Sequence, residues 1–332
     1  MPPRARPLYQ RFDYRGIVSD AESLRFEPAA CAGLLAMHAA GLAVLATGVS
    51  PAALAVAAAL GVVRAFGLTA GYHRYFAHRA FRTSRAGQLL LAGLGASAAQ
   101  LGPLWWAGHH RRHHQHSDRP GDVHSPRQGL LWAHFGWLLS SRYASADLAA
   151  IRDFARFPEL RALDRWHFLP PVALAGACYA LGAWLGAAHG TSGPQMLVVG
   201  FVWSTLALYH VTFAVNSLGH RFGARRFDAG DESRNSGWLA LVTLGDGWHN
   251  NHHRFPRSAR HGLTWREPDP TWWGLRALAA VGLVWDLRPP PAEAYAAVRA
   301  TRRASRPFSH RAASTRPTLA AHAKPNRSPT RA

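Results

Sequence analysis

The sequence predicts an all-α integral membrane protein, with four transmembrane helices in two hairpins and a histidine-rich helical cap on the cytoplasmic side. Three observations lead to this prediction. Four apolar runs are long enough to span a bilayer. Arginine is concentrated outside the short turns that join the paired runs. Clusters of histidine lie next to the ends of the runs.

The four apolar runs are residues 29–49, 52–71, 168–189 and 196–215. About 20 helical residues cross the ~30 Å hydrocarbon layer of a bilayer. Only Ser50–Pro51 separates the first two runs, and only the turn GTSGPQ separates the last two, so each pair predicts a helical hairpin. The alternative, buried helices of a soluble bundle, is disfavoured because soluble chains of this size rarely carry four such runs. His38 and Arg64 lie inside runs, and the sequence assigns neither a role.

The distribution of charge predicts the orientation. The formal net charge is +20, and Lys324 is the only lysine. The N-terminal segment 1–28, the segment between the hairpins and the C-terminal region are rich in arginine, whereas the two hairpin turns contain no Lys or Arg. Positively charged segments remain cytoplasmic, so both termini and the middle segment are predicted to be cytoplasmic. The Arg and Ala bias is typical of a high-GC bacterial genome, which places the chain in a bacterial inner membrane. No signal-peptide core precedes the first run.

Another apolar stretch, residues 87–106, has a core too short to span a bilayer comfortably. If it crossed, the arginines on its two sides would lie on opposite faces of the membrane. This stretch is therefore predicted to be a re-entrant or interfacial helix.

The runs and the segments between them define one membrane domain, residues 29–288. The C-terminal region 289–332 is predicted to be a basic, disordered tail. Beside a membrane, such a tail binds anionic lipid headgroups more simply than nucleic acid. Cys31 and Cys178 both lie in apolar runs and are interpreted as packing residues.

Four histidine-containing elements follow a pattern. They are HRYFAH (His73, His78), HRRHH (His110, His113, His114), NSLGH (Asn216, His220) and HNNHH (His249, His252, His253). In HRRHH and HNNHH the spacing i, i+3, i+4 puts three imidazoles on one face of a helix. All four elements fall on the side predicted to be cytoplasmic. We therefore expect them to converge on one site.

Other histidines do not follow this pattern. A single histidine is more often a surface or hydrogen-bonded residue than a ligand, and about half of the 20 histidines are assigned to such roles. These include His109, His116, His124, His134 and His261 near the clusters, and His310 and His322 in the tail. His261 is expected to cap or pack near the third cluster.

Nine imidazoles are too many for one metal ion and about right for two. Imidazole suits zinc, copper, iron and nickel, and a structural zinc site needs only four ligands. The E-x-x-H pairs of soluble di-iron bundles are absent from the sequence. Two ions held by histidine at a membrane surface therefore favour a redox-active metal, with iron the economical choice. A transporter would place its ligands near the bilayer midplane, whereas these lie at the ends of the runs.

The histidine boxes and the text around them resemble the membrane fatty acid desaturases. The matching stretches include GLTAGYHRYFAHRAF, GPLWWAGHHRRHHQHSD, DVHSPRQGLLWAHFGWLL, TFAVNSLGH and GDGWHNNHHRFPRSARHG. The closest branch is the acyl-CoA Δ9 (stearoyl-CoA-type) desaturases and their bacterial relatives. The resemblance covers residues 64–287, most of the predicted membrane domain.

The resemblance implies a di-iron centre. Its ligands would be His73, His78, His110, His113, His114, His220, His249, His252 and His253, with Asn216 reaching one iron through water. Carboxylates that orient the imidazoles are expected among Asp118, Asp122 and Asp246. The chain departs from the family at Asp246, where Glu is more common, and at Phe213, where Trp is common beside the acyl tunnel.

The resemblance also implies a reaction and its partners. Two iron ions and O₂ would desaturate a saturated fatty acyl chain, carried by CoA and attacked at the Δ9 position, giving a cis-monounsaturated product and water. Removing hydrogen from unactivated CH₂ groups needs a strong oxidant, which is cofactor chemistry. Two electrons would come from a separate ferredoxin-, flavodoxin- or cytochrome-type donor. Candidates for the tunnel wall are Trp105, Trp106, Trp203 and Phe213, and candidates for steering CoA or the donor are Arg74, Arg79, Arg111 and Arg127.

Three competing hypotheses make different predictions. A di-iron hydroxylase of lipid or alkane substrates would share the histidine boxes. A metal-binding or metal-transport membrane protein would bind zinc or copper and consume no O₂. A nucleic-acid-binding protein would need a soluble domain, for which four spans leave no room.

Overall fold

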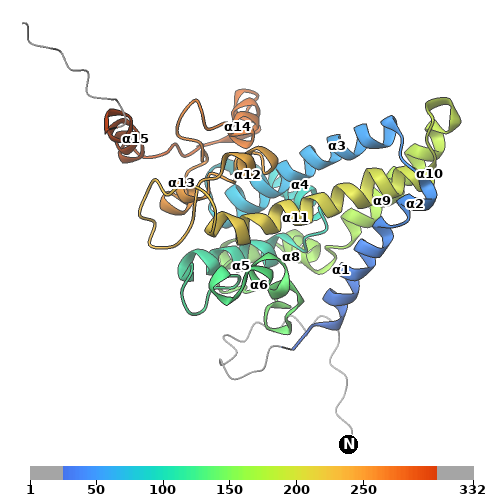
Figure 1. Cartoon of the computed structure of the whole chain (residues 1–332), viewed down its shortest axis with the longest axis horizontal. Helices are drawn as coiled ribbons and strands as arrows, with labels where there is room; N and C mark the ends of the chain where they lie inside the picture. The colour runs from blue at the N-terminus through green and yellow to red at the C-terminus, as the bar shows by residue number, and fades with distance from the viewer. Residues whose placement is uncertain (1–24, 305–332) are drawn as a thin grey trace, which may run out of the picture.

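The computed structural model describes residues 25–304, and these residues are mostly helical (Figure 1). Three continuous helices are long and apolar enough to cross a membrane: Pro28–Thr47, Pro51–Ala77 and Gly193–His220. A fourth span is present if α8 (Pro158–Arg165) and α9 (Leu169–Leu185), which meet at a bend of 63°, are counted together. The four predicted runs are therefore all helical. The third run forms the shortest continuous helix: α9 has 17 residues, whereas the other three long helices have 20, 27 and 28.

The last long helix lies at the centre of the others. It consists of α10 (Gly193–Gln195), the π-helix η7 (Met196–Trp203), α11 (Ser204–Ser217) and the 3₁₀ turn η8 (Leu218–His220). Helices α1 (Pro28–Gly41), α3 (Pro51–Phe66) and α9 all pack against η7. Cys178 of α9 is buried in the resulting apolar cluster with Met196, Val199 and Phe201, as expected for a packing residue. The first long helix, α1 with α2 (Val44–Thr47), consists by contrast of exposed and half-buried residues, and Gly41 is its only buried residue.

Local sequence explains where the second long helix begins and ends. Gly48 has a φ of +66°, and the Ser50 hydroxyl accepts a hydrogen bond from Ala53 N as an N-cap before Pro51. Beyond Phe66 the helix continues as the π-helix η2 (Gly67–Ala77), so it extends past the predicted end at residue 71 and carries His73. Arg64 is buried and donates to Thr205 Oγ1 (2.8 Å) of the central helix and to its neighbour Ser204. Arg64 therefore links two long helices.

The apolar stretch 87–106 is predicted to be one helix. In the structure it is instead divided between two helices. Helix α4 (Arg85–Ala96) ends before a turn, where Ala99 and Leu101 have φ values of +57° and +66°. Helix α5 (Pro103–His116) then begins at Pro103, whose fixed φ suits a first helical turn. Neither helix is long enough to cross a membrane. The break allows α5 to carry the second histidine cluster away from α4.

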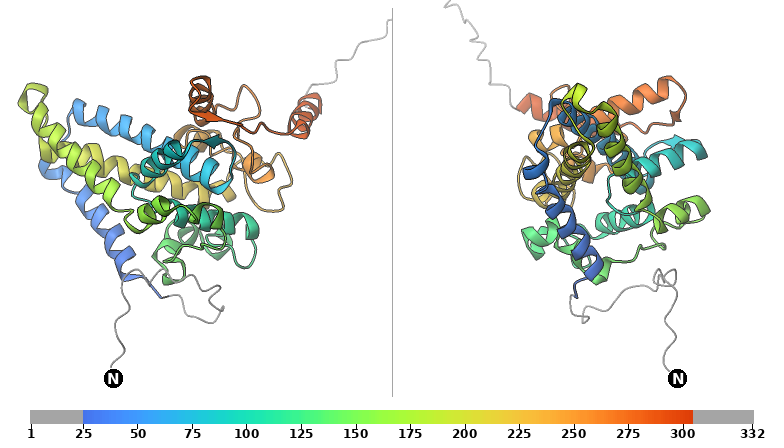
Figure 2. Two further views of the ribbon diagram at one scale, coloured as in Figure 1. Left: turned by 180° about the vertical axis from the view of Figure 1, so that it is seen from behind. Right: turned by 90° about the vertical axis from the view of Figure 1, so that its right-hand side faces the viewer.

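Short elements gather at one end of the long helices and together form a helical cap (Figures 1 and 2). They are η3 (Pro126–Gln128), α6 (Leu130–His134), η4 (Gly136–Leu139), η5 (Ser141–Tyr143), α7 (Arg152–Ala155), α12 (Gly237–Val242), α13 (His249–Arg254) and α14 (Pro270–Ala280). The segment after η2 pairs with the segment after α14. They form a two-stranded antiparallel sheet of β1 (Arg82–Thr83) and β2 (Val284–Trp285). At the opposite end, η6 (Ala187–His189) closes the turn between α9 and α10.

Part of the C-terminal region 289–332, which is predicted to be disordered, is helical. Residues Ala292–Ala304 form helix α15, and Ala294 and Val298 are buried against Leu263. An amphipathic stretch of the tail therefore packs onto the cap, because these small apolar side chains recur at helical spacing. Residues 305–332, including His310 and His322, and most of the segment 1–28 lie outside the described residues.

Candidate metal centre

The first histidine pair is presented by the π-helix η2. A π-helix bonds residue i to residue i+5, and His78 N donates to His73 O at 3.2 Å. This winding puts residues five apart on one face, which is the spacing of HRYFAH. The imidazole centroids of His73 and His78 are 5.0 Å apart. The spacing of the box, which α-helical geometry would not align, is therefore explained by the local helix type.

The second cluster lies on α5, whose first turn is held by a buried carboxylate. Asp164 Oδ1 of α8 accepts hydrogen bonds from Leu104 N (2.9 Å) and Trp105 N (3.0 Å). These are backbone donors that the helix itself cannot satisfy. Gly102 is required just before α5, because a Cβ there would meet Asp164 Oδ1 at 2.1 Å. Asp164 thus fixes the position of the helix that carries three of the histidines.

The third cluster lies on the short helix α13, which buried asparagines anchor. Asn250 Oδ1 accepts from Arg226 N and Phe227 N, both at 2.8 Å. Asn251 is also buried, and its amide donates to His261 O at 3.0 Å. The two residues between the histidines of HNNHH therefore tie α13 to the loops on both sides. The sequence pattern alone does not reveal this role.

The nine patterned histidines divide into two adjacent groups. His73, His78, His110, His114 and His252 form a group of five, and His113, His220, His249 and His253 form a group of four. Within each group one ring nitrogen of every member lies within 4.8 Å of the others. The imidazole centroids of His114 and His253, one from each group, are 4.3 Å apart.

Nitrogen atoms converge closely in the group of five. His252 Nε2 lies 2.9 Å from both His73 Nε2 and His114 Nε2. His110 Nε2 lies 3.0 Å from both His78 Nε2 and His114 Nε2. Metal–nitrogen bonds of about 2.1 Å that meet at right angles place neighbouring ligand nitrogens roughly 3 Å apart. The spacing within this group therefore fits a metal ion.

In the group of four, His220 Nε2 lies 3.0 Å from His249 Nε2. His113 Nε2 and His253 Nε2 are buried and have no hydrogen-bond partner among the described residues. Buried ring nitrogens are costly to leave unpaired, and a metal ion would satisfy them. The donors present therefore fit an ion in this group as well.

Four carboxylates contact the Nδ1 atoms of four of the nine histidines. Asp246 Oδ2 lies 2.7 Å from His73 Nδ1, and Asp122 and Asp118 lie 2.8 Å from Nδ1 of His113 and His220 respectively. Asp231 Oδ2 lies 2.6 Å from His253 Nδ1. A carboxylate only accepts, so each Nδ1 carries a proton and each Nε2 presents a lone pair. This arrangement is typical of metal-bound histidine.

The three acids predicted to orient imidazoles all do so, and Asp246 also contacts His261 Nδ1 at 3.2 Å. The structure adds Asp231, which the sequence analysis missed. Asp231 stands 22 residues before His253, in a loop with no periodicity that could have connected the two.

The electrostatics of the site favour neutral imidazoles. Burial, followed by the neighbouring imidazoles, lowers the pKa of His78, His110, His114, His249, His252 and His253 well below the usual value. His113 differs: burial opposes its charged form, but the Asp122 carboxylate raises its pKa. Burial likewise opposes ionisation of Asp122, but His113 lowers the pKa of that carboxyl. The six histidines with a lowered pKa are thus held in the unprotonated form that binds metal ions.

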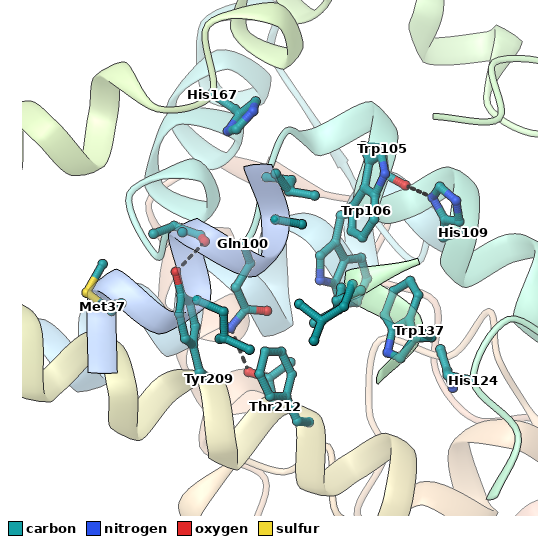
Figure 3. Close-up of a pocket in the computed structure, with 18 of the residues that line it drawn as sticks. Met37, Gln100, Trp105, Trp106, His109, His124, Trp137, His167, Tyr209 and Thr212 are labelled. Atoms are coloured by element: carbon teal, nitrogen blue, oxygen red, sulfur yellow. Dashed lines mark hydrogen bonds between the residues drawn. The ribbon is translucent and has the colours of Figure 1, made fainter. Parts of the chain in front are cut away.

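Figure 3 shows residues that line an apolar cavity, whose volume is about 380 Å³. His110, a member of the group of five, is one of the lining residues. Its volume lies within the range of small-molecule sites. The cavity extends from Met37 of α1 past Trp106 to His110, and Trp106 stacks on His110 with ring centroids 5.0 Å apart. Asn216 also lines the cavity, as do Trp105 and Phe213. A molecule in this cavity would therefore lie next to the histidines.

Other predicted residues lie elsewhere. Trp203 does not line the cavity; it is 43 % exposed, and its Nε1 donates to Gly41 O. The prediction that Arg74 steers CoA or the electron donor is wrong, because Arg74 is fully buried and paired with Asp246 and Asp269. Arg111 is largely buried against Asp153, whereas Arg79 and Arg127 are exposed.

The off-pattern histidines surround the site without joining either group. His109 and His124 line the cavity, and His124 stacks on His113 with centroids 4.2 Å apart. His134 contacts Ser217 Oγ at 2.9 Å. His261 is buried, and burial, followed by Arg74, lowers its pKa to about 4. The prediction that His261 packs near the third cluster is confirmed by its centroid distance of 4.5 Å from His252.

Comparisons with known proteins connect this geometry to a family. The sequence model of the fatty acid desaturases matches residues 50–286. The sn-1 stearoyl-lipid 9-desaturase of Anabaena variabilis is 39 % identical over 223 residues, covering 67 % of this chain and 78 % of that protein. The sn-2 palmitoyl-lipid 9-desaturase of Nostoc sp. (strain 36) is 37 % identical over 222 residues, 65 % of this chain and 74 % of that protein. The icosanoyl-CoA 5-desaturase of Limnanthes douglasii is 35 % identical over 228 residues, 68 % of this chain and 61 % of that protein. The resemblance found in the histidine boxes is confirmed: the chain belongs to the fatty acid desaturase family and is an oxidoreductase.

Proposed function

We propose that the chain introduces a cis double bond at the Δ9 position of a saturated fatty acyl chain. The reaction consumes O₂, two electrons and two protons, and it yields the monounsaturated acyl chain and two molecules of water. The observation that carries the proposal is the junction of an apolar cavity with nine converging histidines at Trp106 and His110. The Δ9 position is taken from the names of the Anabaena and Nostoc relatives, which are 9-desaturases.

Two iron ions would occupy the two histidine groups. The five-histidine group (His73, His78, His110, His114, His252) and the four-histidine group (His113, His220, His249, His253) would each hold one ion. Asn216 would contribute through water to one of them. The irons, when bound, supply the oxidant that takes hydrogen from unactivated CH₂ groups. Imidazole ligands alone do not distinguish iron from zinc or copper. The test of the proposal therefore includes identification of the metal in the purified protein.

The residues of the chain hold and orient the reactants. Asp246, Asp122, Asp118 and Asp231 keep a proton on Nδ1 of their histidines and so aim Nε2 into the site. The apolar walls of the cavity exclude water and confine the acyl chain, so that one C–C pair faces the histidines. Electrons would come from a separate ferredoxin-, flavodoxin- or cytochrome-type donor. Both termini and the histidine groups would lie on the cytoplasmic side of a bacterial inner membrane, with four spans in two hairpins.

The carrier of the acyl chain is the point on which the relatives differ. The resemblance in the histidine boxes implies acyl-CoA, and the Limnanthes relative is named for a CoA substrate. The Anabaena and Nostoc relatives are named for lipid substrates. Both carriers deliver the same apolar chain to the cavity.

The experiment is a fatty-acid methyl ester profile by gas chromatography–mass spectrometry. The full chain is expressed in a bacterium supplied with iron, saturated fatty acid and a co-expressed electron donor, beside a His253→Ala control. A new monounsaturated peak, absent from the control, is the expected result, and derivatisation locates the double bond. A hydroxylated product would replace desaturation with the hydroxylase alternative. Purified protein that binds zinc or copper but no iron, with no new product, would contradict the proposal.

A further inference from the structure

We propose that the acyl chain enters the cavity sideways from the membrane, between α1 and α9, while still attached to a membrane lipid. This inference rests on the proposed function and names the class of substrate carrier. It concerns the end of the cavity away from the histidines.

One face of α1 forms a wall of the cavity. Ala29, Ala30, Gly33, Leu34 and Met37 all line it, and they recur at the three- to four-residue spacing of a helix face. From residue 29 to residue 37 this wall runs about 12 Å along the helix, at 1.5 Å per residue. The cavity therefore follows α1 from its N-terminal end along the first part of the apolar run 29–49.

The start of α9 forms a second wall. His167, Phe168 and Pro171 line the cavity there, and Phe168 is 44 % exposed. Helices α1 and α9 each pack against η7 of the central helix. Between their N-terminal halves the space belongs to the cavity. The exposed lining residues Ala29, Gly33 and Phe168 lie where the cavity meets the outer surface.

The space beside Gly33 is open. A Cβ built on Gly33 meets nothing within 4 Å. Gly33 is exposed and lies on the first long helix, which faces hydrocarbon in the proposed topology. A gap lined by small apolar residues on a lipid-facing helix admits an acyl chain from the bilayer.

The chemistry of the lining favours a lipid over a soluble carrier. Across the described residues, no Arg or Lys lines the cavity; its polar groups are neutral side chains such as Gln100, His167 and Thr212 (Figure 3). A carrier with phosphate groups near the reactive chain would call for cations at the mouth. A lipid headgroup instead stays at the membrane surface, so only its acyl chain needs to pass.

The experiment is photo-crosslinking of the full chain in liposomes, with an activity-independent readout. The probe is phosphatidylcholine with a diazirine near the end of one saturated acyl chain, and labelled peptides are identified by mass spectrometry. The expected result is labelling of cavity residues on α1, α5 and α11, most of which is lost in Gly33→Trp. The control is Gly176→Trp on α9, which is equally exposed and open but lies away from the cavity; it should label like the unchanged protein.

Two results would overturn the inference. Equal labelling in Gly33→Trp and Gly176→Trp would show that the chain does not enter past Gly33. Cavity labelling by a diazirine acyl-CoA, but not by the lipid probe, would assign the cavity to a soluble carrier. Circular dichroism and thermal unfolding are measured on both variants to check that they fold. Lipid labelling that depends on Gly33 in a protein that forms no unsaturated product would uphold this inference while the proposed reaction fails.

Discussion

Single carboxylates decide how the histidines are held. Asp231 contacts His253 Nδ1, and it also accepts from Ser233 N at 2.9 Å, so its position is fixed by the loop. Asp246 is shared by His73, Arg74 and His261. The shorter Asp in place of the more common Glu is therefore accommodated, because both of its oxygens are bonded.

Asp231→Asn tests the orienting role of a residue that sequence analysis missed. Asn keeps the size of the side chain but cannot provide the charged acceptor for His253 Nδ1. Loss of such a partner typically costs about 10–100-fold in metal affinity or activity, and a decrease of this size is expected in both bound metal and desaturation rate. Metal content by mass spectrometry and product by gas chromatography measure it.

The matched control is Asp228→Asn, an exposed acid of the same loop that caps only Gly230 N. It should leave metal content and rate unchanged. If the two variants behave alike, Asp231 does not orient His253.

Asp269→Ala tests the buried charge network behind the site. Asp269 pairs with the fully buried Arg74 at 2.9 Å and accepts from His261 N at 2.7 Å. Removing one partner of a buried ion pair costs about 3–5 kcal/mol, so thermal unfolding in detergent should shift strongly downward.

The comparison variant for Asp269→Ala is Asp286→Ala, which breaks an exposed pair with Arg82. Exposed pairs contribute about 0–1 kcal/mol. A similar small shift for both variants would show that Arg74 is adequately paired by Asp246 alone.

At the scale of elements, the π-helix η2 and helix α4 approach closely. A Cβ on Gly67 would meet Gly95 N at 2.8 Å, and a Cβ on Gly95 would meet the Tyr72 ring at 2.3 Å. These contacts hold η2 against α4 and so position His73. The long second run predicted from hydropathy thus ends in a π-helical segment that packs closely against α4.

Gly67→Ala should destabilise the protein by about 1–3 kcal/mol, because the added methyl group meets backbone that cannot move away. Gly61→Ala, six residues earlier in α3, meets nothing within 4 Å and should be neutral or stabilising by up to about 1 kcal/mol. Unfolding temperatures in the same detergent compare them. Stabilisation by both substitutions would contradict the close approach of η2 and α4.

At the scale of the whole molecule, the metal site joins parts that are distant in sequence. The group of five takes members from η2, α5 and α13, and from His78 just after η2. The group of four takes members from α5, η8 and α13. Bound metal would therefore cross-link the central helix, the second long helix and the cap.

Removal of the metal should weaken this whole assembly. A ligand present at about 100 times its Kd stabilises the folded state by about 2.7 kcal/mol, so chelation should lower the unfolding temperature and abolish desaturation. Adding Fe²⁺ should restore both, whereas Zn²⁺ should restore stability without activity. Differential scanning fluorimetry and product analysis follow the two effects. An unfolding temperature that chelation does not change would show that the histidine groups hold no structural metal.

The sequence by itself determined the apolar runs, the histidine boxes and the family, because these depend on residue type and spacing along the chain. Periodicity could not reveal that HRYFAH lies on a π-helix, that residues 87–106 break into two helices, or that Ala292–Ala304 folds onto the cap. Only the tertiary structure divided the nine histidines into five and four, paired Asp231 with His253, buried Arg74 and placed α1 along the cavity. The physical reason is that ligand grouping, ion pairing and cavity walls depend on distances between segments that are far apart in the sequence, and those distances exist only once the helices have packed.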